Sequence, residues 1–543
     1  MAKIIECVPN FSEGIDQAVI DAISHAIQAT DGCSLLDVDP GTSTNRTVYT
    51  FVGPPEAVVT GAINGAKAAA GLIDMRRHQG EHPRLGALDV CPFIPVANAT
   101  MDDCIECANM FGKRASEELG IPVYLYGFAA KSDYRRAVPQ IRAGEYEGLA
   151  EKIKKDEWKP DYGPAEFIPS WGATIAGARK YLIAYNINVL GTKEQAHRIA
   201  LNLRENGRGP DKPGKLKKVQ GLGWYLQEAN LAQISLNLLD FEETAIHTAF
   251  EEAKKDLEEI NIGICGSEVV GLVPLKSILM AADYYMGKEN LFIMDEKQKV
   301  RLVIERLGLS SIKPFIPEQR IIEFMVGTEK SSPLASSSLR QFIYALGSRS
   351  SAPGGGSAAA AIAAMGSALG LMVGWMSYGN RKFEHLDATM RQLIPPLQKT
   401  MLELVPMIDA DTNAFNEYMA ALKMSHKTPE ETERREAAMQ GGLKTAISVP
   451  LKVMQTANQC WETMVKMAEV GNIATISDIQ VGAKGLETGV FGAYCNVMIN
   501  LKEIKDESYL CTVKTEAESG LKLAKSKLDE VLKVCEERQS AGK

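Results

Sequence analysis

The sequence lacks a cysteine framework, a surplus of basic residues and a signal peptide, and each absence excludes a class of protein. Its ten cysteines are spread over 543 residues without the spacing of a disulfide scaffold. The net charge of −8 argues against a nucleic-acid binder, because phosphate neutralisation needs an excess of Lys and Arg. Lys3 and Glu6 interrupt an N-terminal segment that has no apolar secretion signal. We therefore expect a cytoplasmic protein without a nucleic-acid partner.

Metal-ligand patterns are equally sparse. Cys104 and Cys107 form one Cys-x-x-Cys pair, but no second pair follows, so two reduced thiols on a helix are a better interpretation than a zinc or redox site. His78 and His82 have His-x-x-x-His spacing, but the glycine between them and the proline after them break the helix that would align the pair on a metal. We expect no metal cofactor.

One uncharged segment, residues 358–376, approaches the length of about 20 residues that a bilayer requires. It consists mostly of Ala and Gly, and Gly366, Gly370 and Gly374 recur at every fourth residue. This spacing gives a flat stripe that another helix can approach closely. Because the surrounding segments are helical and amphipathic, we interpret it as a buried helix of a bundle.

Strand-like and helix-like segments alternate through residues 1–326, which indicates helices packed on sheets. The pattern restarts near residue 181, so we predict two α/β subdomains, 1–181 and 182–326, with a cleft between them. The periodicity does not distinguish a parallel from an antiparallel sheet. Residues 327–337 have the composition of a linker. Long helical patterns, such as 385–421, fill residues 338–543, so this second part is predicted to be an all-α domain.

The densest polar cluster extends from Arg76 to Arg84 and includes His78, Glu81 and His82. Its glycines and proline indicate a loop, placed just before a strand-like run. Loops on rigid scaffolds often hold catalytic groups, and histidine suits proton transfer because its pKa lies near neutrality. The pattern leaves two interpretations open, a catalytic histidine or a hydrogen-bonded structural one.

Two further polar clusters follow strand-like runs in the same subdomain. One contains Asn10, and the other contains Asp39 and, a few residues later, Arg46. Turn chemistry alone explains either cluster. They occur in the same subdomain as the loop from Arg76 to Arg84, which we call the histidine loop, and this favours a shared site. We therefore regard these three residues as candidate orienting or polar-binding groups.

A basic stretch between residues 198 and 218 is interrupted by Gly and Pro. It is either a solvated loop or an electrostatic landing site for a flexible polycarboxylate. The residues proposed to bind such an anion are Arg204, Arg208, Lys215, Lys217 and Lys218.

In the helical part, a Gly-rich loop at residues 348–357 precedes the uncharged helix. Such a loop at a helix N-terminus is a generic anion cradle, although it lacks the Gly-Lys-Ser/Thr of a P-loop. Asp409 and Asp411 lie in a later helical segment. Residues two apart on a helix point about 200° away from each other, so only one of them can face a buried site.

Longer motifs resemble one family over essentially the whole chain. Those of the first part, which resemble the formimidoyltransferase domain, are Ile5 to Gly14, Gln79 to Arg84 and Pro169-Ser170-Trp171-Gly172. Those of the second, which resemble formimidoyltetrahydrofolate cyclodeaminase, are Ser351 to Ser357, Val449-Pro450-Leu451, and Gly471-Asn472 with Ser477-Asp478. Their order is similar to that of the bifunctional formimidoyltransferase-cyclodeaminases of vertebrate type.

The resemblance implies two consecutive reactions of histidine degradation, with polyglutamylated tetrahydrofolate as co-substrate. The first transfers the formimidoyl group of N-formimidoyl-L-glutamate to N5 of tetrahydrofolate. The second closes that group onto N10 with release of ammonia. His82 matches the catalytic position of the transferase, and the deaminase acid falls on Asp411, with Asp409 as the alternative.

The resemblance further implies a folate-binding segment, in which Phe167 and Trp171 would pack a pterin or aryl face. Its residues are Gly163, Pro164, Ala165, Glu166, Phe167, Ile168, Pro169, Ser170, Trp171 and Gly172. It also implies a homo-octameric ring of dimers, and association with Golgi membranes, the centrosome and vimentin. The rival hypotheses are a non-catalytic scaffold for filaments and a chain in which one half is inactive.

Overall fold

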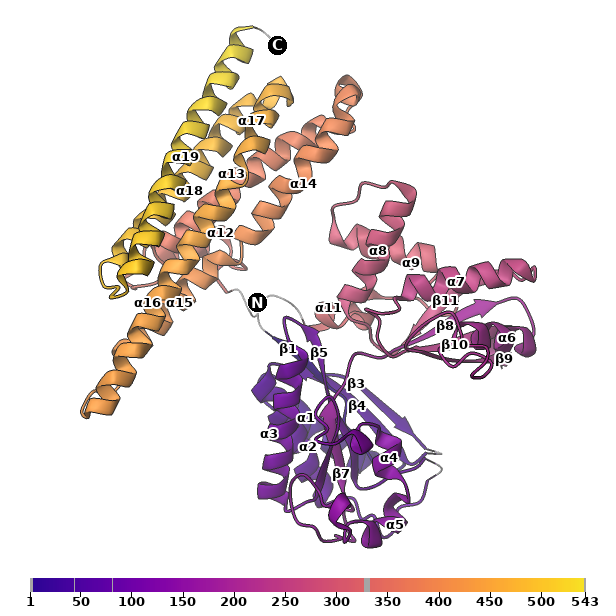
Figure 1. The fold of residues 1–543 in the computed structure, drawn as a ribbon. Helices are drawn as coiled ribbons and strands as arrows, with labels where there is room; N and C mark the ends of the chain where they lie inside the picture. The colour runs from indigo at the N-terminus through magenta and orange to yellow at the C-terminus, as the bar shows by residue number, and fades with distance from the viewer. Residues whose placement is uncertain (1–2, 43, 81, 327–332, 542–543) are drawn as a thin grey trace. The chain divides into compact units, whose positions relative to one another are not determined.

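The computed structural model describes residues 3–42, 44–80, 82–326 and 333–541. The chain forms two compact units, residues 1–328 and 329–543 (Figure 1). The first contains sheets and helices, and the described part of the second is helical, so the predicted fold class is confirmed. Glu81 of the histidine loop, and residues 327–332 of the predicted linker 327–337, lie outside the described residues.

The first subdomain is built on a mixed sheet. Its strands lie in the order β3 (Ser34–Gly41), β4 (Arg46–Gly53), β1 (Ile4–Cys7) with β2 (Asn10–Phe11), β5 (Leu88–Ala97), β7 (Thr174–Ala178) and β6 (Val123–Gly127). β5, β7 and β6 are parallel, whereas β1, β2 and β3 pair antiparallel with their neighbours. β1 and β2 both lie between β4 and β5, because Val8-Pro9 interrupts what would otherwise be one strand.

Helices cover both faces of this sheet. α1 (Gln17–Gln28), α2 (Pro55–Ala70) and α3 (Met101–Leu119) pack side by side on one face (Figure 1). The short helices α4 (Val138–Arg142) and α5 (Glu145–Lys152) cover part of the other face, where Ile141 and Leu149 pack against residues of β5, β6 and β7. α4 and α5 thereby bring polar side chains to the end of the sheet that carries the histidine loop.

The second subdomain contains an antiparallel sheet in the order β11 (Ile264–Val270), β8 (Ile183–Val189), β10 (Leu231–Leu238) and β9 (Val219–Leu226). Alternate residues of β8, such as Ile183, Tyr185 and Ile187, belong to an apolar core shared with the surrounding helices. These helices are α6 (Lys193–Leu203), α7 (Ile246–Glu259), α8 (Leu275–Glu289), α9 (Glu296–Leu307), α10 (Pro317–Arg320) and α11 (Ile322–Val326).

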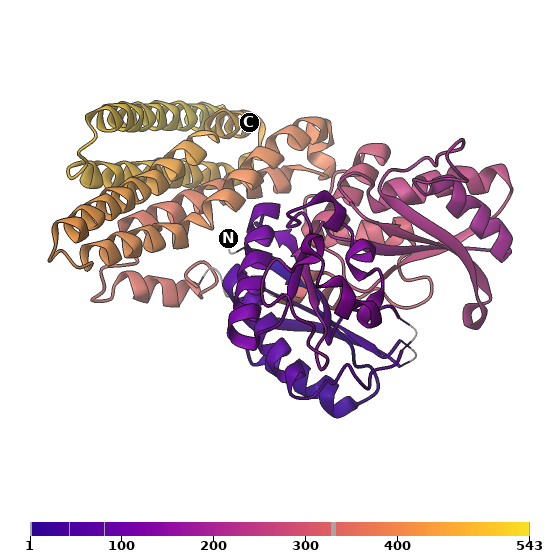
Figure 2. The ribbon, with the colours of Figure 1, turned by 60° about the horizontal axis from the view of Figure 1, so that its bottom comes forward.

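The second unit is a helical bundle (Figure 2). Its helices are α12 (Leu339–Leu346), α13 (Gly355–Ser377), α14 (Asp387–Leu404), α15 (Met407–Leu422), α16 (Pro429–Asn458), α17 (Trp461–Val470), α18 (Ile476–Leu501) and α19 (Glu507–Ser540). The single helix predicted over 385–421 is wrong, because the structure has two helices there: α14 ends at Leu404 and α15 begins at Met407, with Val405-Pro406 between them.

The uncharged helix α13 is long and apolar enough to cross a membrane, but 67% of its most apolar window is buried in the protein. It packs along α18, where a side chain at Gly366 would lie 2.6 Å from the Leu486 nitrogen. Gly370 and Gly374 instead admit Met464 and Ile394 of neighbouring helices. The glycine stripe therefore serves close helix packing inside the bundle, as predicted.

Candidate active sites

A fully buried carboxylate, Asp89 in β5, organises the candidate site of the first unit. Its Oδ1 accepts a hydrogen bond from the N–H of Leu85 at 2.7 Å. Its Oδ2 accepts one from Arg142 Nη2 at 2.7 Å and is also paired with Arg46 Nη1. Arg46 begins β4 and Arg142 ends α4, so two guanidinium groups converge on one carboxylate from different elements.

Two of the three candidate orienting residues lie in this cluster. Asn10 on β2 accepts a hydrogen bond from Arg46 Nε at 3.1 Å, and donates its own amide to the Val8 carbonyl at 2.7 Å. Asp39 is exposed on β3, opposite Val48, and within the described residues no hydrogen bond joins it to the cluster. The structure therefore brings Asn10 and Arg46 together and leaves Asp39 apart.

The surroundings of His82 favour its neutral form. Its Nδ1 lies 2.6 Å from the carbonyl oxygen of Pro83, and because a carbonyl only accepts, Nδ1 carries the proton and Nε2 is the basic nitrogen. Partial burial and the nearby charges of Arg46 and Arg142 lower the pKa of His82, although Pro83 and Asp89 oppose the shift. His82 is therefore a neutral base near pH 7.

His78, the other histidine of the loop, has both ring nitrogens engaged. Nε2 lies 2.8 Å from the Asn45 carbonyl oxygen, and Nδ1 accepts a hydrogen bond from Arg84 Nε at 3.3 Å. A histidine in this arrangement has no lone pair left for a metal. His78 is thus the hydrogen-bonded structural histidine, and it does not form a metal pair with His82.

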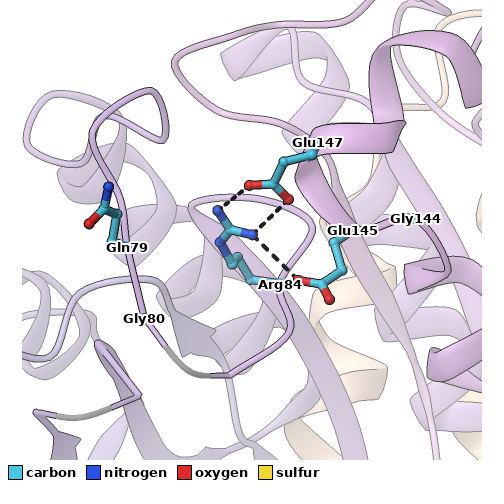
Figure 3. A pocket seen from close by; sticks show the side chains of 6 residues that line it. All are labelled: Gln79, Gly80, Arg84, Gly144, Glu145 and Glu147. Atoms are coloured by element: carbon cyan, nitrogen blue, oxygen red, sulfur yellow. Dashed lines mark hydrogen bonds and ion pairs between the residues drawn. The ribbon is translucent and has the colours of Figure 1, made fainter.

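A pocket of about 490 Å³ opens between the histidine loop and α5 (Figure 3). It is lined by Gln79, Gly80, Arg84, Gly144, Glu145 and Glu147. Arg84 points at Glu147 and binds it through Nη1 at 2.9 Å and Nη2 at 2.6 Å, and Nη1 also lies 3.4 Å from Glu145. Two carboxylates therefore neutralise Arg84, and the pocket is polar without excess positive charge.

The predicted folate-binding segment, residues 163–172, is held against the chain that follows His82. Gly172 pairs with Gly86 as a β-bridge, and the N–H of Ala87 donates to the Trp171 carbonyl at 2.8 Å. Gly172 has φ of +80°, and a Cβ there would lie 2.2 Å from the Leu85 carbonyl oxygen. The close approach of the two segments therefore requires glycine.

The expectation that the Trp171 ring packs a pterin is wrong. Its side chain is only 3% exposed, and Nε1 donates to Thr174 Oγ1 at 3.1 Å, so the ring belongs to the core. Phe167 is half-buried and packs on Tyr146 with ring centroids 5.3 Å apart. Phe167 is therefore the aromatic side chain of this segment that is placed to contact a ligand.

The basic stretch of the second subdomain separates into structural and accessible residues. Lys215 is paired with the buried carboxylate of Asp256, which offsets its charge. Arg208 donates to Asn202 Oδ1 at 2.7 Å. Lys217 and Lys218 are exposed.

Arg204 lines a pocket of about 380 Å³ on the sheet of the same subdomain. The other lining residues are Asn206, Val219, Gln220, Gly221, Leu222, Ser235 and Asn237. Arg204 also donates from Nε to the Gly207 carbonyl at 2.9 Å, and this bond holds its side chain close to the backbone of the basic stretch. The pocket thus offers one guanidinium group among amide, hydroxyl and apolar side chains.

In the second unit, Asp411 on α15 lies against the N-terminus of α13. Ser357 Oγ donates to Asp411 Oδ2 at 3.1 Å. A Cβ at Gly356 would lie 2.0 Å from Asp411 Oδ1, so glycine is required for this approach. Burial raises the pKa of Asp411, and the hydrogen bonds from Ser357 partly oppose the shift. Asp411 is therefore a largely buried carboxyl group beside the Gly-rich loop, and its burial favours the protonated form.

Asp409 has a different environment. It is 4% exposed, and its two oxygens accept the backbone N–H groups of Leu334 at 2.8 Å and Ala335 at 3.0 Å. These bonds fasten the segment before α12 to α15. As the helical spacing predicts, the two aspartates face different surroundings. Asp409 has a structural role, because both of its oxygens accept backbone N–H groups.

Two residues of the first site, Asp89 and Arg142, were not identified from the sequence. Asp89 carried a signal, since it is an acid inside the apolar strand run that follows the histidine loop. Arg142 carried none, because it is one of several basic residues in a polar segment. Its contact with Asp89 depends on the placement of α4 over the sheet.

Family models match nearly the whole chain. They are described as the N-terminal subdomain of the formiminotransferase domain over residues 4–179, the formiminotransferase domain over 184–327 and formiminotransferase-cyclodeaminase over 338–519. The formimidoyltransferase-cyclodeaminase of Rattus norvegicus is 58% identical over 542 residues, which cover 99% of this chain and 100% of the rat protein.

Shorter relatives match parts of the chain. The glutamate formimidoyltransferase of Streptococcus pyogenes is 39% identical over 291 residues, covering 53% of this chain and 95% of that protein. The methenyltetrahydrofolate cyclohydrolase of Methylorubrum extorquens is 33% identical over 171 residues, covering 32% of this chain and 82% of that protein. These relatives are enzymes by name, and none supports a non-catalytic scaffold.

Proposed function

The chain belongs to the formimidoyltransferase-cyclodeaminase family, and from this premise we propose that its two units catalyse consecutive folate reactions. In the α/β unit, the formimidoyl group of N-formimidoyl-L-glutamate moves to N5 of tetrahydrofolate, and glutamate leaves. In the helical unit, N10 attacks the same carbon, ammonia leaves and 5,10-methenyltetrahydrofolate forms. Because the donor is a product of histidine breakdown, the enzyme belongs in that pathway.

The observation that carries the first reaction is the neutral His82 with a basic Nε2. N5 attacks the amidine carbon and must lose its proton, which Nε2 accepts. The imidazolium then returns this proton to the amine nitrogen of glutamate as its bond to the amidine carbon breaks. A lowered pKa suits both steps, because the imidazole is ready to accept and its conjugate acid readily donates.

Asp411 supports the second reaction. Attack of N10 gives a tetrahedral carbon bonded to N5, N10 and an amino group, and that amino group must be protonated before it leaves as ammonia. A carboxylic acid whose pKa is raised by burial can supply the proton and recover one from N10. Asp411 fits this role better than Asp409, whose two oxygens are occupied by backbone N–H groups.

Tetrahydrofolate is the co-substrate that the family shares, and we extend this to folates with a polyglutamate tail. Each added glutamate carries a carboxylate, and exposed cations suit such a flexible polyanion. Arg204, Lys217 and Lys218 retain this proposed role, with Arg208 at their side. Lys215 should contribute less to this role, because Asp256 offsets its charge.

Formation of methenyltetrahydrofolate from formimidoylglutamate and tetrahydrofolate, followed by its absorbance, tests the whole sequence of reactions. Release of glutamate and of ammonia reports each step separately. His82→Ala should lower glutamate release by about 10²–10⁴-fold and leave ammonia release from supplied 5-formimidoyltetrahydrofolate intact. Fragments 1–326 and 335–543 should each retain one activity. A wild-type chain that releases neither product would overturn the proposed function.

The assembly and cellular location are further proposals drawn from the family. We propose a homo-octameric ring of dimers in the cytoplasm, associated with Golgi membranes, the centrosome and vimentin. Light scattering of the purified chain should give eight times its mass. Co-sedimentation with vimentin filaments, and separately with vesicles, tests the proposed associations. A monomeric chain would contradict the octamer, and a chain that sediments with neither filaments nor vesicles would contradict the associations.

A further inference from the structure

The cluster around Asp89 carries more positive than negative charge. The two guanidinium groups of Arg46 and Arg142 share a single carboxylate, and both contact the same oxygen, Oδ2. The other oxygen is occupied by the N–H of Leu85. The side chains of Arg46 and Arg142 are only 11% and 14% exposed, so water compensates little of the remaining charge.

Arg142 also has hydrogen-bonding capacity that the described protein does not use. Its Nε is buried and has no partner among the described residues. Nη2 is the only one of its guanidinium nitrogens with a hydrogen bond in that part of the chain. Buried polar groups are nearly always paired, so an orphaned donor beside an excess positive charge indicates a place for an anion.

The chemistry of the transfer reaction identifies which anion would lie here. In N-formimidoyl-L-glutamate the leaving nitrogen is bonded to Cα, which also bears the α-carboxylate. That carboxylate is therefore two bonds from the nitrogen that receives the proton from His82. The γ-carboxylate is two methylene groups farther away, and the carboxylates of folate lie at the opposite end of that molecule from N5.

We propose that Arg142, together with Arg46, binds the α-carboxylate of the formimidoyl donor and so fixes the leaving nitrogen beside His82. This inference rests on the proposed transferase function and adds the donor subsite to it. Asp89 orients both guanidinium groups, and Asn10 holds Arg46 through Nε. The spare donors of Arg142 form charge-assisted hydrogen bonds to the substrate.

A donor without the α-carboxylate tests the assignment directly. N-Formimidoyl-4-aminobutyrate keeps the amidine and the distal carboxylate but has hydrogen in place of the α-carboxylate. The wild-type enzyme should prefer formimidoylglutamate by about 10- to 100-fold in kcat/KM, the range expected for loss of a charge-assisted hydrogen bond. In Arg142→Met this preference should shrink about tenfold or more, because kcat/KM falls for formimidoylglutamate and not for the 4-aminobutyrate donor.

Two further variants separate binding from folding. Arg142→Lys keeps the charge without the planar donor pair and should give an intermediate preference. Arg136→Met is the matched control, because Arg136 is 72% exposed and paired with Asp133 outside the cluster. Thermal unfolding reports whether each variant is folded.

The outcomes distinguish this inference from the proposed function. A wild-type enzyme that transfers from both donors equally, or an Arg142→Met enzyme that weakens both donors to the same extent, would overturn the subsite. If the Arg142→Met chain does not fold, the Arg142→Lys enzyme decides. Its preference for formimidoylglutamate over the 4-aminobutyrate donor must then lie between the wild-type value and 1. Absence of transferase activity in the wild type would instead overturn the proposed function.

Discussion

At the residue scale, the protonation of His82 sets the pH range of the transferase. Burial and the positive charges of Arg46 and Arg142 lower the pKa of His82 below 6.5. The neutral base therefore persists to lower pH, and the acidic limb of kcat/KM, which reports the free enzyme, should lie below pH 6.5. Arg142→Gln removes one of the two charges, so its acidic limb should move upward towards 6.5.

The control for this prediction is Arg136→Gln, in which the lost charge is remote from the cluster and the limb should stay at its wild-type position. A wild-type limb above pH 6.5, or a limb that Arg142→Gln moves downward, would contradict the electrostatic account of His82. Folate chemistry is common to all three enzymes, so the comparison isolates the protein group.

The two aspartates of α15 should fail in different ways when they are replaced. Asp411→Asn should lower ammonia release by about 10²–10⁴-fold while thermal stability changes little, because a general acid is lost. Asp409→Ala leaves two backbone N–H groups without an acceptor, each worth about 1–3 kcal/mol, so it should lower the unfolding temperature while the chemistry of the folded enzyme persists. The reverse pattern would reassign the acid to Asp409.

The residues of the first site show what sequence reasoning can reach. The histidine loop and the strand-end positions of Asn10 and Arg46 were found because polar residues break a local pattern. Arg46, Asp89 and Arg142 meet only because β4 and β5 flank β2 and because α4 folds back over the sheet. No local sequence pattern encodes the contacts of Arg46 and Arg142 with Asp89. The position of Trp171 was predicted wrongly for the same reason, because its burial depends on tertiary packing.

At the scale of elements, the position of Arg142 depends on how α4 ends. The Lys152 ammonium of α5 donates to three carbonyl oxygens at the C-terminus of α4, those of Gln140 at 3.2 Å, Ile141 at 2.7 Å and Ala143 at 3.0 Å. A cation at this helix end satisfies carbonyls that have no helical partner. Lys152 therefore fixes the backbone of Ile141 and Ala143, the two residues that flank Arg142.

Lys152→Met should loosen α4 and lower transferase activity by up to about 10²-fold, the effect of a misplacement near 1 Å. Burial, with Lys155 and Arg135 nearby, lowers the pKa of Lys152 from 10.5 to about 8. The unfolded chain thus binds more protons between pH 8 and 10.5, so wild-type stability should rise relative to Lys152→Met across that window. A pH-independent difference in unfolding temperature would contradict this linkage.

Periodicity predicted the longer elements because one buried face of a helix or strand leaves a regular trace. α1, for example, buries four apolar residues at helical spacing. The short helices α4 and α5, which carry Arg142 and Lys152, are too brief for such a trace. At Pro406 the apolar pattern continued across a turn, which is why one helix was predicted where two exist.

At the scale of the whole molecule, two units of different architecture handle one unstable adduct in succession. The first makes 5-formimidoyltetrahydrofolate, and the second consumes it. If the folate carries the polyglutamate tail that we propose, neither reaction changes that tail. A binding surface for the tail can therefore retain the intermediate while the pterin exchanges between sites, without any change in the chemistry of either site.

This retention should depend on tail length and on Lys217 and Lys218. Exposed ion pairs contribute about 0.2–1 kcal/mol each. The double variant Lys217→Ala, Lys218→Ala should therefore raise the release of free intermediate about 2- to 30-fold with a pentaglutamyl folate. With a monoglutamyl folate the release should not change. Lys254→Ala with Lys255→Ala, on the exposed face of α7, removes the same charge elsewhere and should have no effect. Added salt should reproduce the release in the wild type, because it screens exposed charges. If the Lys217 and Lys218 variant releases no more intermediate than wild type at any tail length, the tail is held by other residues.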